Sequence, residues 1–129
     1  MRILIVDDNA DAADTLSLFL EHAGAEVSVA RAGEEALASF PLLRPDVVLL
    51  DIGMPEMDGY EVARRIRALE GGNETVLIAL TGWGQESDQR RATQAGFDHH
   101  FTKPADLAAL QALLGRVADG APRLELPVE

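Results

Sequence analysis

Five polar residues of the sequence stand at the ends of runs that are typical of short strands, in a pattern that could bring them together. Asp7 and Asp8 follow one apolar run, and Asp51 and Thr81 each follow another. Lys103 comes after the short strand predicted from Phe97 to Phe101. Three carboxylates close together repel one another unless a cation neutralises them. Oxygen ligands without nearby His or Cys favour a hard divalent ion, most naturally Mg²⁺. A lysine and a hydroxyl group beside such a metal are typical of a phosphate-binding site.

The elements that must position these residues alternate regularly along the chain. The apolar runs predict short buried strands, and amphipathic patterns between them predict helices. Strands are predicted at residues 2–6, 26–30, 47–50, 76–80 and 97–101. This alternation predicts an α/β fold with a five-stranded, mainly parallel sheet and helices on both faces. The strand ends then share one edge, where open sheets of this kind bind ligands.

Two features of the predicted elements depend on finer patterns. The strand at 26–30 alternates polar and apolar residues, which indicates an edge position, and the helix after it opens at Gly33 and is closed by Pro41 and Pro45. The last helix has an inward stripe predicted from Leu107, Leu110, Leu114 and Val117. The residues predicted to form a smooth outer surface on it are Ala105, Ala108, Ala109, Ala112 and Leu113. That surface suits a partner helix, although alanines are also simply good helix formers.

The composition limits the functional classes that the chain can serve. At 129 residues it is one domain, predicted at 1–118 with a loosely ordered tail at 119–129. The formal net charge of −11 argues against direct binding to nucleic acid or to an anionic membrane. Cysteine is absent, which excludes thiol chemistry and disulfides. The sequence shows neither a membrane span nor a signal peptide, so a cytoplasmic location is expected.

The residues at the strand ends also match a known family. Over residues 2 to about 118 the chain resembles the receiver domain of two-component response regulators. The matching pieces, in the order of the family, are Asp7-Asp8, the run from Asp51 to Gly59, Thr81-Gly82 and Lys103-Pro104. The resemblance implies a flavodoxin-like (βα)5 fold with strand order 2-1-3-4-5, which the pattern alone leaves open.

The resemblance implies roles for the polar residues in phosphoryl transfer. Asp51 would be the phosphoacceptor that takes a phosphoryl group from a phosphohistidine and forms an aspartyl phosphate. Lys103 would pair with one phosphoryl oxygen, and Thr81 would hydrogen-bond another after phosphorylation. The peptide bond between Lys103 and Pro104 is expected to be cis.

The resemblance also implies a set of Mg²⁺ ligands. Asp8 would bind the ion directly and Asp7 largely through water, and Asp51 would complete the carboxylate set. The remaining ligand from the protein would be the backbone carbonyl of Gly53. Positioning and charge neutralisation, rather than an acid–base pair, would then drive the transfer.

Three positions depart from the usual pattern of the family. His100 stands three residues before Lys103, where the family usually has the Tyr or Phe that moves inward together with Thr81. His100 could act as a pH-sensitive switch residue, or it could be an edge-strand histidine without that role. In the family, the positions that Gly53 and Trp83 occupy tune dephosphorylation. Gly53 offers no side chain to orient water, and Trp83 could partly cover the phosphoryl group.

The amino-acid sequence around Thr81 and Lys103 is similar to that of receivers attached to hybrid histidine kinases. Neither an effector domain nor a DNA-binding helix pair follows, so a stand-alone receiver, or one excised from a longer sensor, is expected. Its partners would be a histidine kinase or a histidine phosphotransfer protein. The resemblance implies a signalling module, a monomer or weak phosphorylation-dependent dimer, that catalyses only its own phosphorylation and dephosphorylation.

Two other classes of protein fit the sequence less well. An Mg²⁺-dependent phosphohydrolase with Asp51 as nucleophile usually has a second Asp two residues later, where this chain has Gly53. A flavin-binding module would need a phosphate loop after the first strand, where the pair Asp7-Asp8 would repel phosphate.

Overall fold

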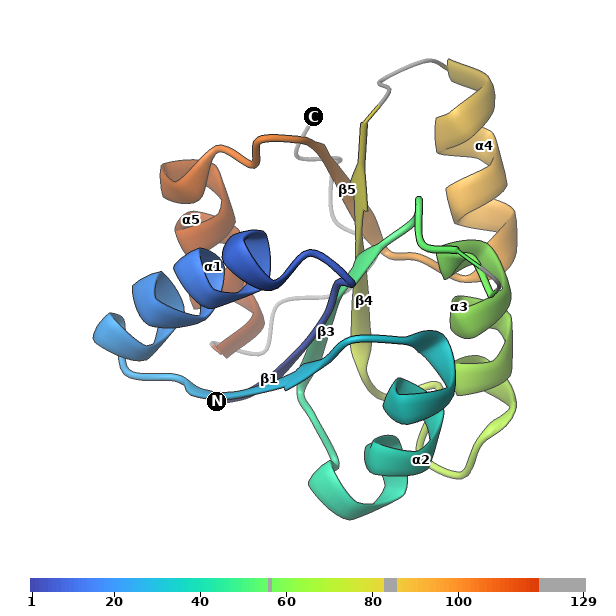
Figure 1. Cartoon of the computed structure of the whole chain (residues 1–129), viewed down its shortest axis with the longest axis horizontal. Helices are drawn as coiled ribbons and strands as arrows, with labels where there is room; N and C mark the ends of the chain where they lie inside the picture. Colours follow the sequence, from blue (N-terminus) through green and yellow to red (C-terminus); the bar gives the residue numbers. More distant parts are fainter. Residues whose placement is uncertain (56, 83–85, 119–129) are drawn as a thin grey trace.

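The computed structural model describes residues 1–55, 57–82 and 86–118, without the side chains of 86–89. The predicted tail at 119–129 and the covering role of Trp83 lie outside these residues. Five strands alternate with five helices in the described part of the chain (Figure 1). In chain order these are β1 (Arg2–Val6), α1 (Ala10–His22), β2 (Glu26–Ala30), α2 (Gly33–Leu43), β3 (Val47–Asp51), α3 (Gly59–Ala68), β4 (Val76–Thr81), α4 (Glu86–Ala95), β5 (His99–Thr102) and α5 (Leu107–Ala118).

The strands form one parallel sheet in the order β2-β1-β3-β4-β5. The α/β class predicted from the alternation and the strand order implied by the resemblance are both confirmed. β3 lies at the centre, and its five residues are all buried. β2 lies at one edge and is less buried than β1, β3 or β4, which confirms its predicted position. The central strands are apolar along their whole length because helices cover both faces.

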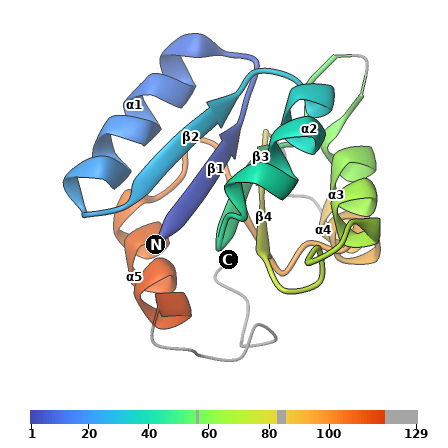
Figure 2. The same cartoon turned by 90° about the horizontal axis from the view of Figure 1, so that it is seen from below.

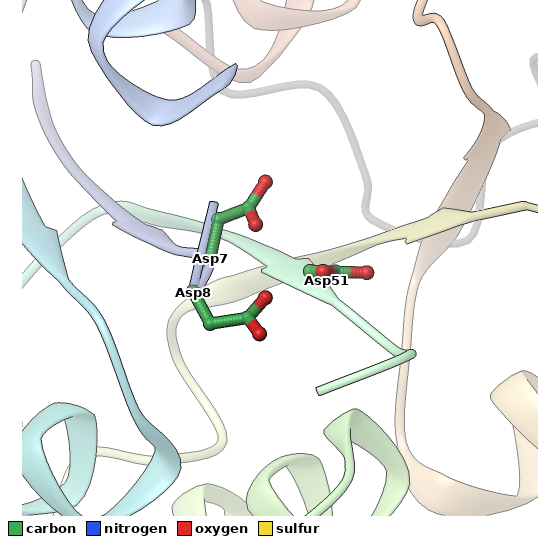
Figure 3. Close-up of side chains that lie close together, drawn as sticks. All are labelled: Asp7, Asp8 and Asp51. Atoms are coloured by element: carbon green, nitrogen blue, oxygen red, sulfur yellow. The ribbon is translucent and has the colours of Figure 1, made fainter. Parts of the chain in front are cut away.

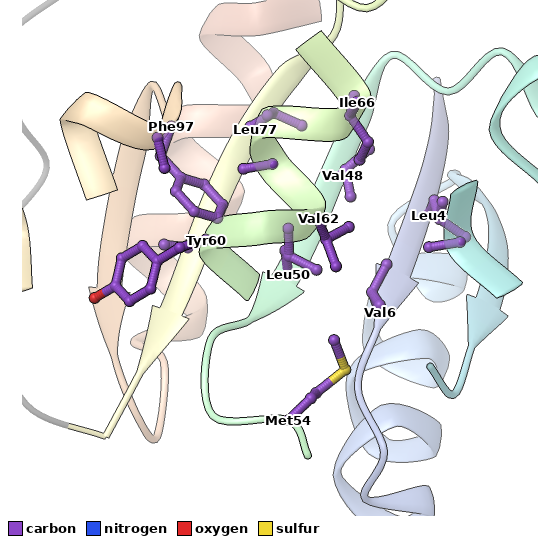
Figure 4. Close-up of a cluster of buried hydrophobic side chains, with 14 of the residues drawn as sticks. Leu4, Val6, Val48, Leu50, Met54, Tyr60, Val62, Ile66, Leu77 and Phe97 are labelled. Atoms are coloured by element: carbon purple, nitrogen blue, oxygen red, sulfur yellow. The ribbon is translucent and has the colours of Figure 1, made fainter. Parts of the chain in front are cut away.

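Two apolar layers enclose the sheet. α1 and α5 cover one face, and α2, α3 and α4 cover the other (Figures 1 and 2). Side chains along each strand alternate between the two layers. The layer under α2, α3 and α4 includes Leu4, Val6, Val48, Leu50, Tyr60, Ile66, Leu77 and Phe97 (Figure 4). Among the described helices, none has the length and apolar character that crossing a membrane requires.

The last strand begins two residues later than predicted. Phe97 was predicted to open it, but its N–H donates to the carbonyl of Ala92 at 3.0 Å, so it belongs to the C-terminal turn of α4. Gly96 makes this turn possible with φ of +109°. The Phe97 side chain is buried in the layer under α3 and α4. Phe97 thus belongs to the end of α4 and not to β5.

The prediction that Pro41 closes the second helix is wrong. Pro41 lies inside α2, which continues to Leu43. A proline in the last turn removes one backbone donor, but Phe40 before it is buried and anchors this turn to the core. The helix ends at Arg44, which adopts φ of +47° and donates its N–H to the Phe40 carbonyl at 2.9 Å.

The predicted faces of the last helix need correction at several positions. Ala105 and Ala109, predicted on the outer surface, are half-buried and pack against the layer under α1 and α5. Leu113, predicted on the outer surface, is 2% exposed, while Leu107, predicted to face inward, is 37% exposed. Leu110 and Leu114 are buried as predicted. Leu113 packs in the layer between α1, α5 and the sheet, together with Phe101. The buried face of α5 therefore includes Leu110, Leu113 and Leu114, and Leu107, the first residue of the helix, lies outside it.

Candidate functional site

Three carboxylates meet where β1 and β3 end. Asp7 directly follows β1, Asp8 comes next, and Asp51 is the last residue of β3. β1 and β3 are paired neighbours with Val6 opposite Leu50, so Asp7 and Asp51 lie side by side. One oxygen from each of the three residues lies within 4.8 Å of the others (Figure 3). The side chains of Asp7 and Asp51 are buried and that of Asp8 is exposed, so the cluster opens to solvent on one side.

A lysine from the end of the sheet reaches this cluster. Lys103 Nζ lies 3.1 Å from Asp51 Oδ1 and 3.7 Å from Asp7 Oδ2. Its backbone N–H donates to the Thr81 carbonyl at 2.7 Å, which ties the residue to the end of β4. The peptide bond between Lys103 and Pro104 is cis, as the family resemblance implied. One ammonium group therefore serves two of the three carboxylates.

The negative charge of the three carboxylates is not fully offset by the positive charge of Lys103. Burial raises the pKa of the Asp7 carboxyl above its ordinary value, and the nearby charge of Asp51 acts in the same direction. The Asn9 N–H, which donates to Asp7 Oδ1 at 2.9 Å, and the charge of Lys103 oppose the increase without cancelling it. An ionised Asp7 therefore costs free energy in the protein without metal.

The donor set fits a hard divalent cation. It consists of oxygen atoms only, its spacing allows one ion to contact all three residues, and its negative charge exceeds that of the single lysine. The loop after β3 folds back onto the cluster, because the Gly53 N–H donates to Asp51 Oδ1 at 3.1 Å. A metal-binding role for the Gly53 carbonyl stays a prediction.

The run from Asp51 to Gly59 also has a structural role that the sequence patterns did not reveal. Asp58 caps the N-terminus of α3 by accepting the N–H of Glu61 at 3.0 Å. A Cβ at Gly59 would lie 2.7 Å from Ile52 Cα and 2.8 Å from the Asp51 carbonyl oxygen. Gly59 therefore lets the first turn of α3 pack directly against the chain that carries the site.

A cavity of about 410 Å³ adjoins Asp51. It brings together the ends of three strands, with Asp51 from β3, Thr81 from β4 and Lys103 after β5. Tyr60 and Arg91 also line it, and sequence reasoning did not find them. Tyr60 reads as part of the apolar stripe of its helix and Arg91 as part of a polar helix. Only the packing of α3 against α4 places them beside the site.

His100 lies on β5 opposite Ala79 of β4, whose side chain belongs to the layer under α2, α3 and α4. Side chains paired in a parallel ladder point to the same face, so His100 faces this layer. Its ring is partly exposed, but its Nε2 atom is buried and has no hydrogen-bond partner among the described residues. The structure therefore agrees with either predicted reading of His100.

The family model described as response regulator receiver domain matches residues 3–115. Among curated proteins, an uncharacterised 14.6 kDa protein of Leptolyngbya boryana is 42% identical, over 82% of this chain and 81% of that protein. The transcriptional regulatory protein TrcR of Mycobacterium tuberculosis is 35% identical over all of this chain. The virulence sensor protein BvgS of Bordetella bronchiseptica is 36% identical over 98% of this chain. The chain spans 49% of TrcR and 10% of BvgS.

Solved structures show the same architecture. The chemotaxis protein CheY4 of Vibrio cholerae superimposes with a TM-score of 0.85 at 31% identity, covering 90% of this chain and 97% of that one. The receiver domain of a histidine kinase from Syntrophus aciditrophicus gives a TM-score of 0.84 at 34% identity. That comparison covers 96% of this chain and 94% of the other.

Proposed function

Because this chain belongs to the response regulator receiver domain family of two-component systems, we propose that Asp51 is its phosphoacceptor. The observation that carries the proposal is the contact of Lys103 Nζ with Asp51 at 3.1 Å, beside two further carboxylates and an open cavity. This arrangement leaves a nucleophilic carboxylate accessible and surrounds it with groups that can bind a phosphoryl group and a metal ion.

The proposed reaction moves one phosphoryl group between two side chains. An oxygen of Asp51 attacks the phosphorus of a phosphohistidine, and the bond from phosphorus to the imidazole nitrogen breaks. The imidazole leaves with the electron pair and takes up a proton, and Asp51 becomes an aspartyl phosphate. Hydrolysis later restores the carboxylate and releases inorganic phosphate. Lys103 holds a phosphoryl oxygen in both steps, and its charge offsets the negative charge that collects there.

Asp7, Asp8 and Asp51, with the Gly53 carbonyl, are the residues that would hold Mg²⁺. The bound ion would neutralise charge on the transferring phosphoryl group. The residues themselves fix the acceptor: the Gly53 N–H and Lys103 both bind Asp51 Oδ1, so the carboxylate is held in one orientation.

Thr81 and His100 form the proposed switch. Thr81 ends β4 beside the acceptor strand, and its hydroxyl would hydrogen-bond the phosphoryl group once Asp51 is modified. Movement at the end of β4 would reach α4 directly and β5 through the contact between Lys103 N–H and the Thr81 carbonyl. The outer surfaces of α4, β5 and α5 would then carry the signal.

We place the receiver domain at residues 1–118 and propose that it acts in the cytoplasm, as part of a phosphorelay. A histidine kinase or a histidine phosphotransfer protein would supply the phosphoryl group. The start of α1, next to Asp8, would receive the donor helix, and the small side chains of Ala10 and Ala12 leave room for it. The module would catalyse only its own phosphorylation and dephosphorylation.

Incubation with Mg²⁺ and acetyl phosphate, followed by measurement of the intact mass, tests the proposal. We expect a single phosphate adduct that is absent from the Asp51→Asn variant and from samples treated with a chelator. Hydrolysis of free phosphomonoesters without any adduct would instead support a phosphohydrolase.

A further inference from the structure

One arginine of α4 is held over an aromatic ring at the edge of the phosphorylation cavity. The guanidinium carbon of Arg91 lies 4.1 Å from the centroid of the Tyr60 ring. Tyr60 is only 5% exposed and packs in the apolar layer with Phe97 and Leu50, so the ring is a fixed support (Figure 4). A cation at this distance from a ring face is attracted to it. The stack therefore restrains a side chain that would otherwise move freely in solvent.

The stack lines the same cavity as Asp51, Thr81 and Lys103. The two cations of this cavity differ in their partners. Lys103 lies within ion-pair distance of Asp51 and Asp7, whereas Arg91 has no carboxylate that close among the described residues. Arg91 lines the cavity while stacked on Tyr60, so an anion that enters the cavity meets its charge.

The cavity needs such a charge. Three carboxylates and a net charge of −11 repel an incoming phosphoryl group, and one lysine shared between two carboxylates offsets only part of this repulsion. A guanidinium group can donate two parallel hydrogen bonds to phosphate oxygens. A guanidinium already restrained on a ring loses little conformational entropy when it does so.

We propose that Arg91 is a second phosphoryl-binding cation of this site and that Tyr60 is the support that holds it over the cavity. The inference rests on the proposed function, since it assigns Arg91 to the phosphoryl group that Asp51 receives. The ligand class is a phosphoryl group carried by a small acyl phosphate or by a phosphohistidine.

The neighbouring Arg90 provides a matched control. It is exposed on α4, it does not line the cavity, and its removal changes the net charge by the same amount. Successive residues of a helix point in different directions, so the two arginines face different surroundings. We expect Arg91→Gln to lower the second-order rate constant for phosphorylation by acetyl phosphate about five- to tenfold, and Arg90→Gln less than about twofold. Arg91→Lys should recover part of the phosphorylation rate, because lysine keeps the positive charge but cannot donate two parallel hydrogen bonds as a guanidinium group does.

Two further measurements separate this role from a structural one. Tyr60→Phe keeps the ring and should keep the rate, whereas Tyr60→Leu should lower it toward that of Arg91→Gln. The affinity for beryllofluoride with Mg²⁺, which requires no transfer step, should fall by a factor similar to the rate. Thermal unfolding of each variant identifies any loss of fold, and Arg91→Gln should unfold as the wild type does.

Equal rates for Arg91→Gln and Arg90→Gln would overturn the inference, because they would show a general effect of charge. An unchanged affinity for beryllofluoride in Arg91→Gln would overturn it as well. A wild-type protein that takes up no phosphate would contradict the proposed function itself. Normal phosphorylation of wild type and Arg91→Gln alike would remove only the role of Arg91.

Discussion

At the scale of one residue, Asp7 shows that the site contains a carboxylate whose ionised form is unfavourable in the folded protein. Its pKa is raised in the folded protein, mainly by burial, above the value of the unfolded chain. The folded state then holds its proton more tightly, so the stability of the metal-free protein decreases as pH rises through the folded pKa of Asp7. Above that pKa the ionised carboxylate opposes folding.

We therefore expect Asp7→Asn to stabilise the metal-free protein at neutral pH by about 1 kcal/mol. Saturating Mg²⁺ should raise the unfolding temperature of the wild type but not that of the variant, because binding to the folded state alone adds stability. Urea unfolding with a chelator and thermal unfolding with Mg²⁺ measure the two effects. Asp8→Asn, at the exposed member of the cluster, should give a smaller gain without metal. A less stable Asp7→Asn protein would contradict this account.

Gly59 provides a second test at the same scale. A Cβ there would meet backbone atoms of Ile52 and Asp51 at 2.7 and 2.8 Å, and backbone cannot yield as a flexible side chain does. Gly59→Ala should therefore cost about 2 kcal/mol in urea unfolding and slow phosphorylation, since it pushes α3 away from the site. Gly115→Ala is the control: its Cβ would meet nothing within 4 Å in α5, and it should stabilise by about 0.5 kcal/mol. Equal effects would show that contact with the backbone is not the cause.

At the scale of the elements, Arg67 holds together the end of the sheet opposite the site. From α3, its guanidinium donates to the carbonyls of Gly96 at 2.6 Å, Gly72 at 2.7 Å and Thr75 at 2.8 Å. It also pairs with Asp98 at 2.9 Å, and the Asp98 carboxylate accepts the Leu77 N–H at 3.0 Å. One side chain thus links α3 to the segments that enter β4 and β5.

Arg67→Met should destabilise the protein by about 3 kcal/mol, because it leaves a largely buried carboxylate without its cation. Arg64→Met on the same helix removes an exposed partner of Glu61 and should change the free energy of unfolding very little. Urea unfolding measures both variants. Because Arg67 lies away from Asp51, the folded fraction of the variant should still be phosphorylated at the wild-type rate. A small loss of stability would mean that water replaces the guanidinium group.

The elements also show what the sequence can and cannot predict. Runs such as 47–50 predict strands because both faces are buried, and the acidic, hydroxyl and lysine residues predict the site because they end those runs. Pro41, Leu113 and Phe97 were misassigned because their places depend on packing against other elements. The links made by Arg67 and Arg91 join segments whose proximity only the folded chain creates.

At the scale of the whole molecule, charge and topology act together. A parallel sheet brings the ends of β1, β3 and β4 together, and the acidic residues there form a cluster whose spacing suits a metal ion. β3 and β4 are buried along their whole length. We expect a new charge at Asp51 to act on β5, the outermost strand on that side of the sheet, which is tied to β4 at Thr81 and carries His100.

The response of His100 shows whether a change at Asp51 reaches β5. Beryllofluoride with Mg²⁺ mimics the phosphoryl group, and it should shift the imidazole resonances of His100 at constant pH, because movement at Thr81 would change the surroundings of the buried Nε2 atom. His22, exposed at the end of α1, is the internal control and should not shift. Nuclear magnetic resonance of histidine-labelled protein measures all three histidine rings in one sample, and the loss of its signals in His100→Gln identifies His100. Asp51→Asn should abolish the response. Identical His100 resonances in both states would leave it an edge-strand histidine without a switching role.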